Sequence, residues 1–78
     1  MGVVLRYSRH ARDVLEERGI REEWVELTLS DPSREELGQP PPRRSRLRRF
    51  GERMLRVVFA EESGETILIT AYFDRRAE

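Results

Sequence analysis

The apolar and polar positions of the first thirty residues predict one short strand followed by two helices. Apolar side chains alternate along the strand at Val3, Leu5 and Tyr7. Ser8 stands where a helix N-cap is expected, and apolar residues then recur at helical spacing as far as Gly19, a residue type that commonly follows the last helical turn. A second helix is predicted from about residue 21 to residue 30, and Asp31-Pro32 closes it. Its inward face is expected to carry Trp24, Val25, Thr28 and Leu29.

The segment after the second helix is predicted to be a connection rather than part of the sheet. Ser33-Arg34-Glu35-Glu36 matches a capping box, which permits one helical turn there. Pro40-Pro41-Pro42 forms an extended spacer, because proline cannot donate a backbone hydrogen bond within a central strand. We therefore expect a loop between the helical half of the chain and the sheet.

The second half of the chain predicts a three-stranded antiparallel meander. Its strands are residues 44–50, 53–60 and 66–73, joined by tight turns at Gly51-Glu52 and Ser63-Gly64. The odd-numbered positions of the last two strands are apolar and are expected to pack on the helices: Leu55, Val57, Phe59, Ile67, Ile69, Ala71 and Phe73. The even-numbered positions are mixed: Met54, Arg56, Val58, Ala60, Leu68, Thr70 and Tyr72. This second face is too apolar for solvent and too polar for a core, which indicates a groove or a partner surface.

These elements predict a single α+β domain over residues 1–78, with two N-terminal helices on one face of a small antiparallel sheet in the order β-α-α-β-β-β. A chain of this length builds one small core. It has no cysteine, and His10 with Asp13 does not make a ligand set, so we expect no metal and no cofactor. Its apolar runs are far shorter than the ~20 residues of a membrane span. We expect a cytoplasmic protein without membrane contact.

Charge adds a functional hypothesis to this picture. The formal charges of the chain sum to zero, yet Arg43–Arg56 holds seven arginines and one glutamate, so that +6 there is balanced by −6 elsewhere. Arginines in such a stretch can each neutralise a phosphate. The candidate nucleic-acid-binding residues are Arg44, Arg46, Arg48, Arg49, Arg75 and Arg76. The first three share one face of a strand, and Arg49 lies on the other with Leu47. The alternative is an edge strand that charge protects from aggregation.

Four short motifs carry a resemblance to known proteins: Ser8-Arg9-His10-Ala11, Glu17-Arg18-Gly19-Ile20, Asp31-Pro32 and Thr70-Ala71-Tyr72-Phe73. With the element order, they resemble the RelE-like superfamily of small bacterial toxins, and in particular the domain-of-unknown-function family 4258. The helical pair is also similar to that of BrnT-type toxins. The resemblance implies a sheet with two helices on one face and, in active toxins that cut messenger RNA, an RNA-contacting surface on the other. It also implies an antitoxin as partner.

RNA cleavage of that type would use Arg56 and Tyr72 as candidate catalytic residues, because strand parity places them on one face of the sheet. Arginine can hold the charge of the reacting phosphate, and tyrosine can stack on a base or donate a proton. No general base is evident beside them, and a lone His10 is more typical of capping or packing. The leading interpretation is a toxin-related protein that binds or cleaves RNA through an arginine-rich sheet face.

The alternative interpretation is a non-catalytic interaction domain whose half-apolar second face binds a protein partner or its own copy as a homo-oligomer. A charge introduced at Val58 or Leu68 would then be expected to disrupt association.

Overall fold

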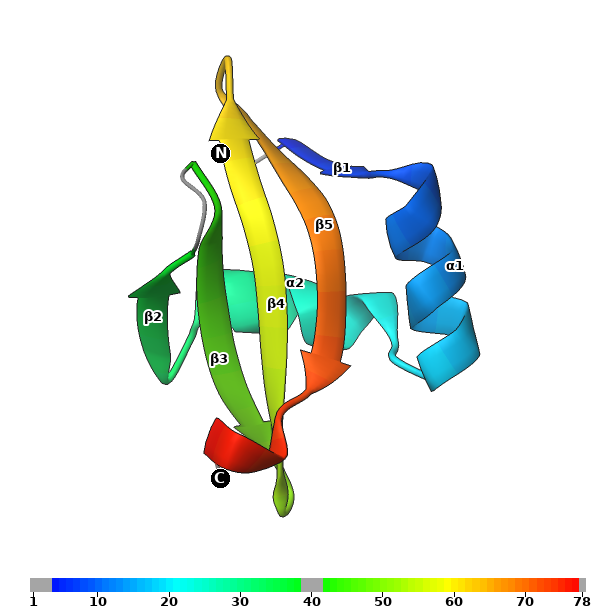
Figure 1. Ribbon diagram of the computed structural model, residues 1–78, viewed down its shortest axis with the longest axis vertical. Helices are drawn as coiled ribbons and strands as arrows, with labels where there is room; N and C mark the ends of the chain where they lie inside the picture. Colours follow the sequence, from blue (N-terminus) through cyan, green and yellow to red (C-terminus); the bar gives the residue numbers. More distant parts are fainter. Residues whose placement is uncertain (1–3, 39–41, 78) are drawn as a thin grey trace.

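The computed structural model describes residues 4–38 and 42–77, which form one five-stranded sheet with two helices packed on it (Figure 1). The elements in chain order are β1 (Val4–Tyr7), α1 (Arg9–Arg18), α2 (Glu22–Ser30), β2 (Arg34–Leu37), β3 (Arg44–Phe50), β4 (Arg53–Glu62), β5 (Glu65–Phe73) and the short 3-10 helix η1 (Arg75–Ala77). The strands lie in the order β1-β5-β4-β3-β2, and the sheet is mixed because β1 runs parallel to β5. The predicted α+β fold with two helices on a small sheet is confirmed, and the predicted meander corresponds to β3, β4 and β5. The sheet is mixed where an antiparallel one was expected, and β2 adds one strand to the expected order.

Helix α1 begins and ends at the residues that the sequence predicts. The hydroxyl of Ser8 accepts a hydrogen bond from the amide of Ala11 at 3.0 Å, which satisfies one of the free amides of the first turn. Gly19 ends the helix with a left-handed φ of 66°, a conformation that costs glycine little. The amide of Ile20 then donates to the carbonyl of Leu15 at 2.9 Å and closes the last turn.

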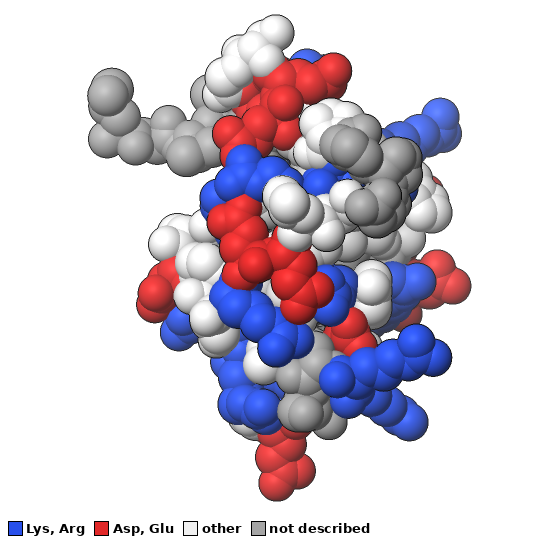
Figure 2. Space-filling model, turned by 60° about the vertical axis from the view of Figure 1, so that its left-hand side comes forward, with Lys and Arg blue, Asp and Glu red and all other residues white. Residues whose placement is uncertain are grey.

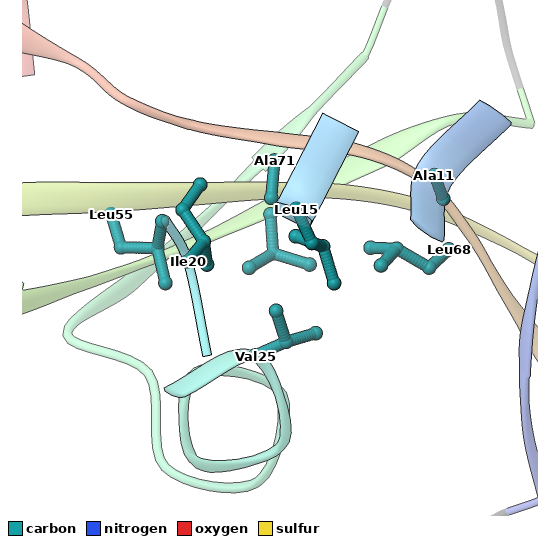
Figure 3. Packing of buried hydrophobic residues seen from close by; sticks show 8 residues of the cluster. Ala11, Leu15, Ile20, Val25, Leu55, Leu68 and Ala71 are labelled. Carbon is teal, nitrogen blue, oxygen red and sulfur yellow. The ribbon is translucent and has the colours of Figure 1, made fainter. Parts of the chain in front are cut away.

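The core lies between the two helices and the sheet. Its cluster contains Ala11, Leu15, Ile20, Val25, Leu55, Val57, Leu68 and Ala71, which converge from α1, the α1–α2 connection, α2, β4 and β5 (Figure 3). Val25 and Thr28 of α2 are fully buried, and Trp24 and Leu29 are partly buried and pack against the cluster. The predicted inward face of α2 is therefore confirmed. The ring centroids of Trp24 and Phe50 also lie 5.7 Å apart.

A β-bulge changes which residues of β5 reach this core. The register of β4 and β5 shifts between Val58 and Phe59, where Ile69 is the additional residue of β5. Because one extra residue inverts the alternation of side chains, Leu68 lies in the core with 0% exposure, and Ile67 is half-buried on the opposite face. The prediction that Leu68 belongs to the second face, and Ile67 to the helix face, was wrong.

The expectation that the segment after α2 is a connection outside the sheet, with a helical turn possible at Ser33–Glu36, was also wrong, because Arg34–Leu37 forms the edge strand β2. Glu35 is the cross-strand partner of Arg46, and its carboxylate accepts hydrogen bonds from Arg44 at 2.6 Å and from Arg46 at 3.4 Å. Such opposite-charge pairs stabilise a strand pair, and here they override the capping pattern. The predicted Pro40-Pro41-Pro42 spacer falls largely on residues 39–41, outside the described residues.

Candidate nucleic-acid interface

Three of the arginines expected to meet nucleic acid lie on the face of the sheet that α2 covers. Arg44, Arg46 and Arg48 pair across to β4 residues that face the core side. Their partners are Phe59, Val57 and Leu55, in that order. The strand parity predicted for these arginines is confirmed, and the face that they share is the helix side.

These three side chains are held by acids and carbonyls of the protein itself. Besides Glu35, Arg44 contacts Glu61 at 2.7 Å. Arg46 donates to the carbonyl of Leu29 at 2.7 Å, which joins β3 to the end of α2. Arg48 donates to the carbonyl of Asp31 at 2.6 Å and to its carboxylate at 2.9 Å. The guanidiniums of Arg44 and Arg46 also lie 5.5 and 4.7 Å from the ring centroid of buried Phe59.

The pKa of Glu35 is shifted by burial and by its two arginine partners, Arg44 and Arg46. Burial opposes its ionisation, but the hydrogen bonds and positive charges of Arg44 and Arg46 outweigh burial and lower the pKa of Glu35 below its ordinary value of 4.5. The carboxylate is therefore ionised at neutral pH, and much of the positive charge of the two arginines is neutralised within the protein.

Arg56 lies on the other face of the sheet, between two carboxylates. Its Nε donates to Asp74 at 2.8 Å, and one of its terminal nitrogens donates to Glu36 at 3.0 Å. Only 15% of its side chain is exposed. Glu36 also pairs with Arg34 at 3.0 Å. Arg56 is thus a member of a four-residue ion-pair network, and its positive charge is already balanced.

A groove of about 660 Å³ opens at the end of the sheet where β5 finishes. It is lined by Arg18, Glu52, Arg53, Tyr72, Phe73 and Arg75. These residues come from the end of α1, the β3–β4 turn with the first residue of β4, the end of β5 and the start of η1, all of which lie in the lower half of the molecule in Figure 1. The groove is therefore assembled from four separate parts of the chain.

Two of the groove arginines are fixed against its aromatic wall. A terminal nitrogen of Arg18 donates to the carbonyl of Ala71 at 2.8 Å, and its guanidinium lies 5.9 Å from the ring centroid of Tyr72. The guanidinium of Arg53 lies 3.5 Å from the ring centroid of Phe73. These cation–π contacts place positive charge beside the exposed ring of Tyr72 and the half-buried ring of Phe73 without neutralising it.

The groove also differs from the rest of the surface in charge. Within residues 4–38 and 42–77, Arg18, Arg53 and Arg75 form no ion pair with a carboxylate. Glu52 is the single acid among the lining residues, so the lining carries two net positive charges. Figure 2 shows basic side chains on both sides of the lower part of the molecule and an acidic side chain at its lowest point, below a region where basic and acidic side chains alternate. The groove lining therefore carries positive charge that is not paired with a carboxylate of the described residues.

The structure brings together only part of the predicted site. Tyr72 and Arg75 line the groove, whereas Arg56 does not, although strand pairing places it directly beside Tyr72 as parity predicts. Arg49 and Arg76 are exposed outside the lining. The roles of these residues toward RNA stay predictions.

Sequence reasoning did not select Arg18, Glu52 and Arg53 as site residues. Two signals were available: Arg53 lies within the basic stretch Arg43–Arg56, and Arg18 stands directly before the inter-helix Gly19, at the end of α1.

The described residues give no sign of a metal site. Among them, no group of three or more histidine, cysteine, aspartate or glutamate side chains is placed to hold a metal ion. His10 is exposed in the first turn of α1. In the same part of the chain, no helix has the length and apolar character needed to span a membrane.

Comparison with known proteins identifies a family. A family model described as a domain of unknown function (DUF4258) matches residues 7–73. The matched segment contains five of the groove residues and ends just before Arg75. No curated protein and no solved structure matches the chain. Because the match extends from the end of β1 to the end of β5, this protein belongs to the DUF4258 family.

Proposed function

We propose that this protein binds single-stranded RNA in the groove at the end of β5, as a RelE/BrnT-like, toxin-related protein of the cytoplasm. The observation that carries the proposal is one groove lined by Tyr72 and by three arginines, Arg18, Arg53 and Arg75, that have no acidic partner among the described residues. Phosphate contacts dominate the affinity of proteins for nucleic acids, and an arginine already paired with a carboxylate contributes little to them.

The aromatic part of the groove favours a single strand over a duplex. The side chain of Tyr72 is among the exposed large apolar residues, with 36% of its surface accessible. An unpaired base can stack on such a ring, whereas bases inside a duplex have no free face. Arg18 beside the ring and Arg53 beside Phe73 can then donate to the flanking phosphates, because a planar guanidinium makes two parallel hydrogen bonds to oxygen.

The competing interpretation, an interaction domain that binds through the second face of the sheet, has weaker support. In the described part of the chain the exposed large apolar residues are Leu27, Leu37 and Tyr72, which lie on three different elements. Val58 of the second face is half-buried, and Leu68 is in the core. A protein interface usually needs a contiguous exposed apolar patch, and the three exposed residues are divided among α2, β2 and β5.

Fluorescence anisotropy with a fluorescein-labelled 12-nucleotide RNA tests the proposal. Wild-type protein is expected to bind the single strand more tightly than the same sequence annealed as a duplex, and Tyr72→Ala is expected to weaken binding to the single strand. The matched control is Arg6→Gln, which removes an arginine of β1. Arg6 pairs with Glu65 at 2.9 Å, at the end of β5 opposite to the groove.

The proposal fails if wild type does not bind, or if both variants lose affinity equally. Sedimentation of the same samples identifies self-association, the result expected of the interaction domain. Gel analysis of the RNA after incubation reports whether binding is followed by cleavage.

A further inference from the structure

We infer that Arg56 is a positioning residue for the groove: it holds Asp74, and through Asp74 it sets the place of Arg75. This inference rests on the proposed RNA-binding function and assigns Arg56 a different part in it from direct contact with phosphate. Asp74 joins β5 to η1.

Three hydrogen bonds fix Asp74 at the point where the chain leaves the sheet. Its amide donates to the carbonyl of Met54 at 2.8 Å, which continues the pairing with β4 by one residue. One carboxylate oxygen accepts from Arg56 at 2.8 Å, and the other accepts from the amide of Arg76 at 3.0 Å. The second of these bonds begins the turn of η1, as aspartate side chains do at such starts. Arg75 lies inside this turn and lines the groove.

The surroundings of Arg56 argue against a direct contact with ligand. Arg34, Glu36, Arg56 and Asp74 carry two positive and two negative charges, so the network as a whole offers no net attraction to phosphate. The side chains of Arg56 and Asp74 are 15% and 14% exposed. To reach a phosphate, the guanidinium of Arg56 would have to break its contacts with both carboxylates. The two half-buried carboxylates would then lose this positive partner, which costs free energy.

The position of Arg56 in the sheet explains how it acts at a distance from the ligand. Arg56 is the cross-strand partner of Tyr72, and its side chain reaches along the sheet face to Asp74, two residues further on. It therefore ties the end of β5 to β4 between two groove residues, Tyr72 and Arg75. If this tie is removed, η1 keeps the backbone bond of Asp74 to Met54 but loses its side-chain anchor on β4.

A double-mutant cycle with the labelled single-stranded RNA separates positioning from contact. Arg75→Gln is expected to weaken binding by about tenfold, as for loss of one charged hydrogen-bonded contact. Arg56→Gln is expected to weaken it by a similar factor, and the double variant is expected to bind no more weakly than Arg75→Gln alone. A direct contact predicts instead that the two losses multiply, and that result would overturn the inference.

A second readout needs no RNA. The ¹⁵N heteronuclear NOE values of the Arg75 and Arg76 amides are expected to fall in Arg56→Gln and to stay unchanged in the control Arg6→Gln. Unchanged values in Arg56→Gln would also overturn the inference. If Arg56→Gln does not fold, Asp74→Asn replaces it, because the amide oxygen can still accept from Arg76 while the charge pair with Arg56 is lost. If the wild-type protein does not bind RNA, the proposed function is contradicted. The NOE values then still test whether Arg56 anchors Asp74 and η1.

Discussion

Arg56 and Tyr72 are paired residues on neighbouring strands, yet their side chains have different surroundings. The guanidinium of Arg56 lies between the carboxylates of Glu36 and Asp74, whereas the ring of Tyr72 lines an open groove beside Arg18. Strand pairing alone would assign them one shared role. The ion pairs separate them into a proposed anchor and a candidate contact residue, and the same difference between paired and unpaired arginines distinguishes Arg44 from Arg53.

Salt dependence should report the number of groove arginines that contact RNA. For a single strand, the slope of log affinity against log salt concentration is about −0.7 per phosphate neutralised. Arg53→Gln is therefore expected to weaken binding by about tenfold at low salt and to reduce the slope by about 0.7. Anisotropy titrations at several salt concentrations measure both quantities. The Arg44→Gln variant, which changes an arginine that is already paired, should keep the wild-type slope, and an equal loss in both variants would contradict this account.

The β-bulge predicts unequal costs for two neighbouring substitutions. Leu68→Ala leaves a cavity in the core and is expected to lower the free energy of unfolding by about 2–5 kcal/mol. Ile67→Ala, on the half-buried opposite face, should cost clearly less. Urea denaturation followed by circular dichroism measures both. The reverse order of costs would mean that β5 keeps an unbroken alternation.

Substitution of Gly19, at the end of α1, is expected to lower stability through the backbone conformation and not through a steric clash. A Cβ at Gly19 would meet no heavy atom within 4 Å, but φ there is 66°. Gly19→Ala is therefore expected to destabilise the protein by about 1–2 kcal/mol through the left-handed conformation alone. Gly19→Asn should cost less, because asparagine tolerates this region. Equal stability of the three proteins in thermal denaturation would show that the turn does not require this conformation.

The buried hydroxyl of Tyr7 predicts a loss of stability in alkali. Burial, reinforced by the charges of Glu22 and Glu26, raises the pKa of Tyr7 from 10.0 to about 12. Between these values the unfolded chain releases the proton and the folded protein keeps it, so stability is complete below pH 10.0 and is lost as the pH rises toward 12. Denaturant titrations from pH 8 upward measure this decline.

Tyr7→Phe is the matched control for the alkaline decline. Within the described residues the Tyr7 hydroxyl has no hydrogen-bond partner, so its removal should cost little at neutral pH and should abolish the part of the decline that belongs to this group. An identical decline in wild type and Tyr7→Phe would assign it to other residues.

Local signals were sufficient to predict the helices and most strands. Ser8 and Gly19 mark the ends of α1 through single hydrogen bonds and one dihedral angle, which depend only on neighbouring residues. The turns at Gly51 and Gly64 have positive φ values of 65° and 78°, and a glycine between two strand-like segments predicts such a turn. The strands of the meander follow from these turns.

Features that depend on distant residues could not be predicted in the same way. Ile69 fits the apolar alternation of β5, and only pairing with β4 makes it the additional residue of a bulge. Strand β2 forms because Glu35 meets Arg44 and Arg46, which lie about ten residues further along the chain. The groove likewise joins Arg18 to Arg53 and Tyr72 through the packing of α1 on β5. A basic stretch in the sequence does not distinguish arginines that pair with acids from arginines that do not.

The most direct test of the central claim is a ¹H–¹⁵N correlation titration of the full chain with an unlabelled single-stranded RNA. Binding in the groove predicts progressive shifts of the Arg18, Arg53 and Tyr72 amides, with the β2 amides unaffected. Absence of any shift, or shifts confined to β2 and β3 with the groove amides unchanged, would contradict the claim that this end of the sheet binds RNA.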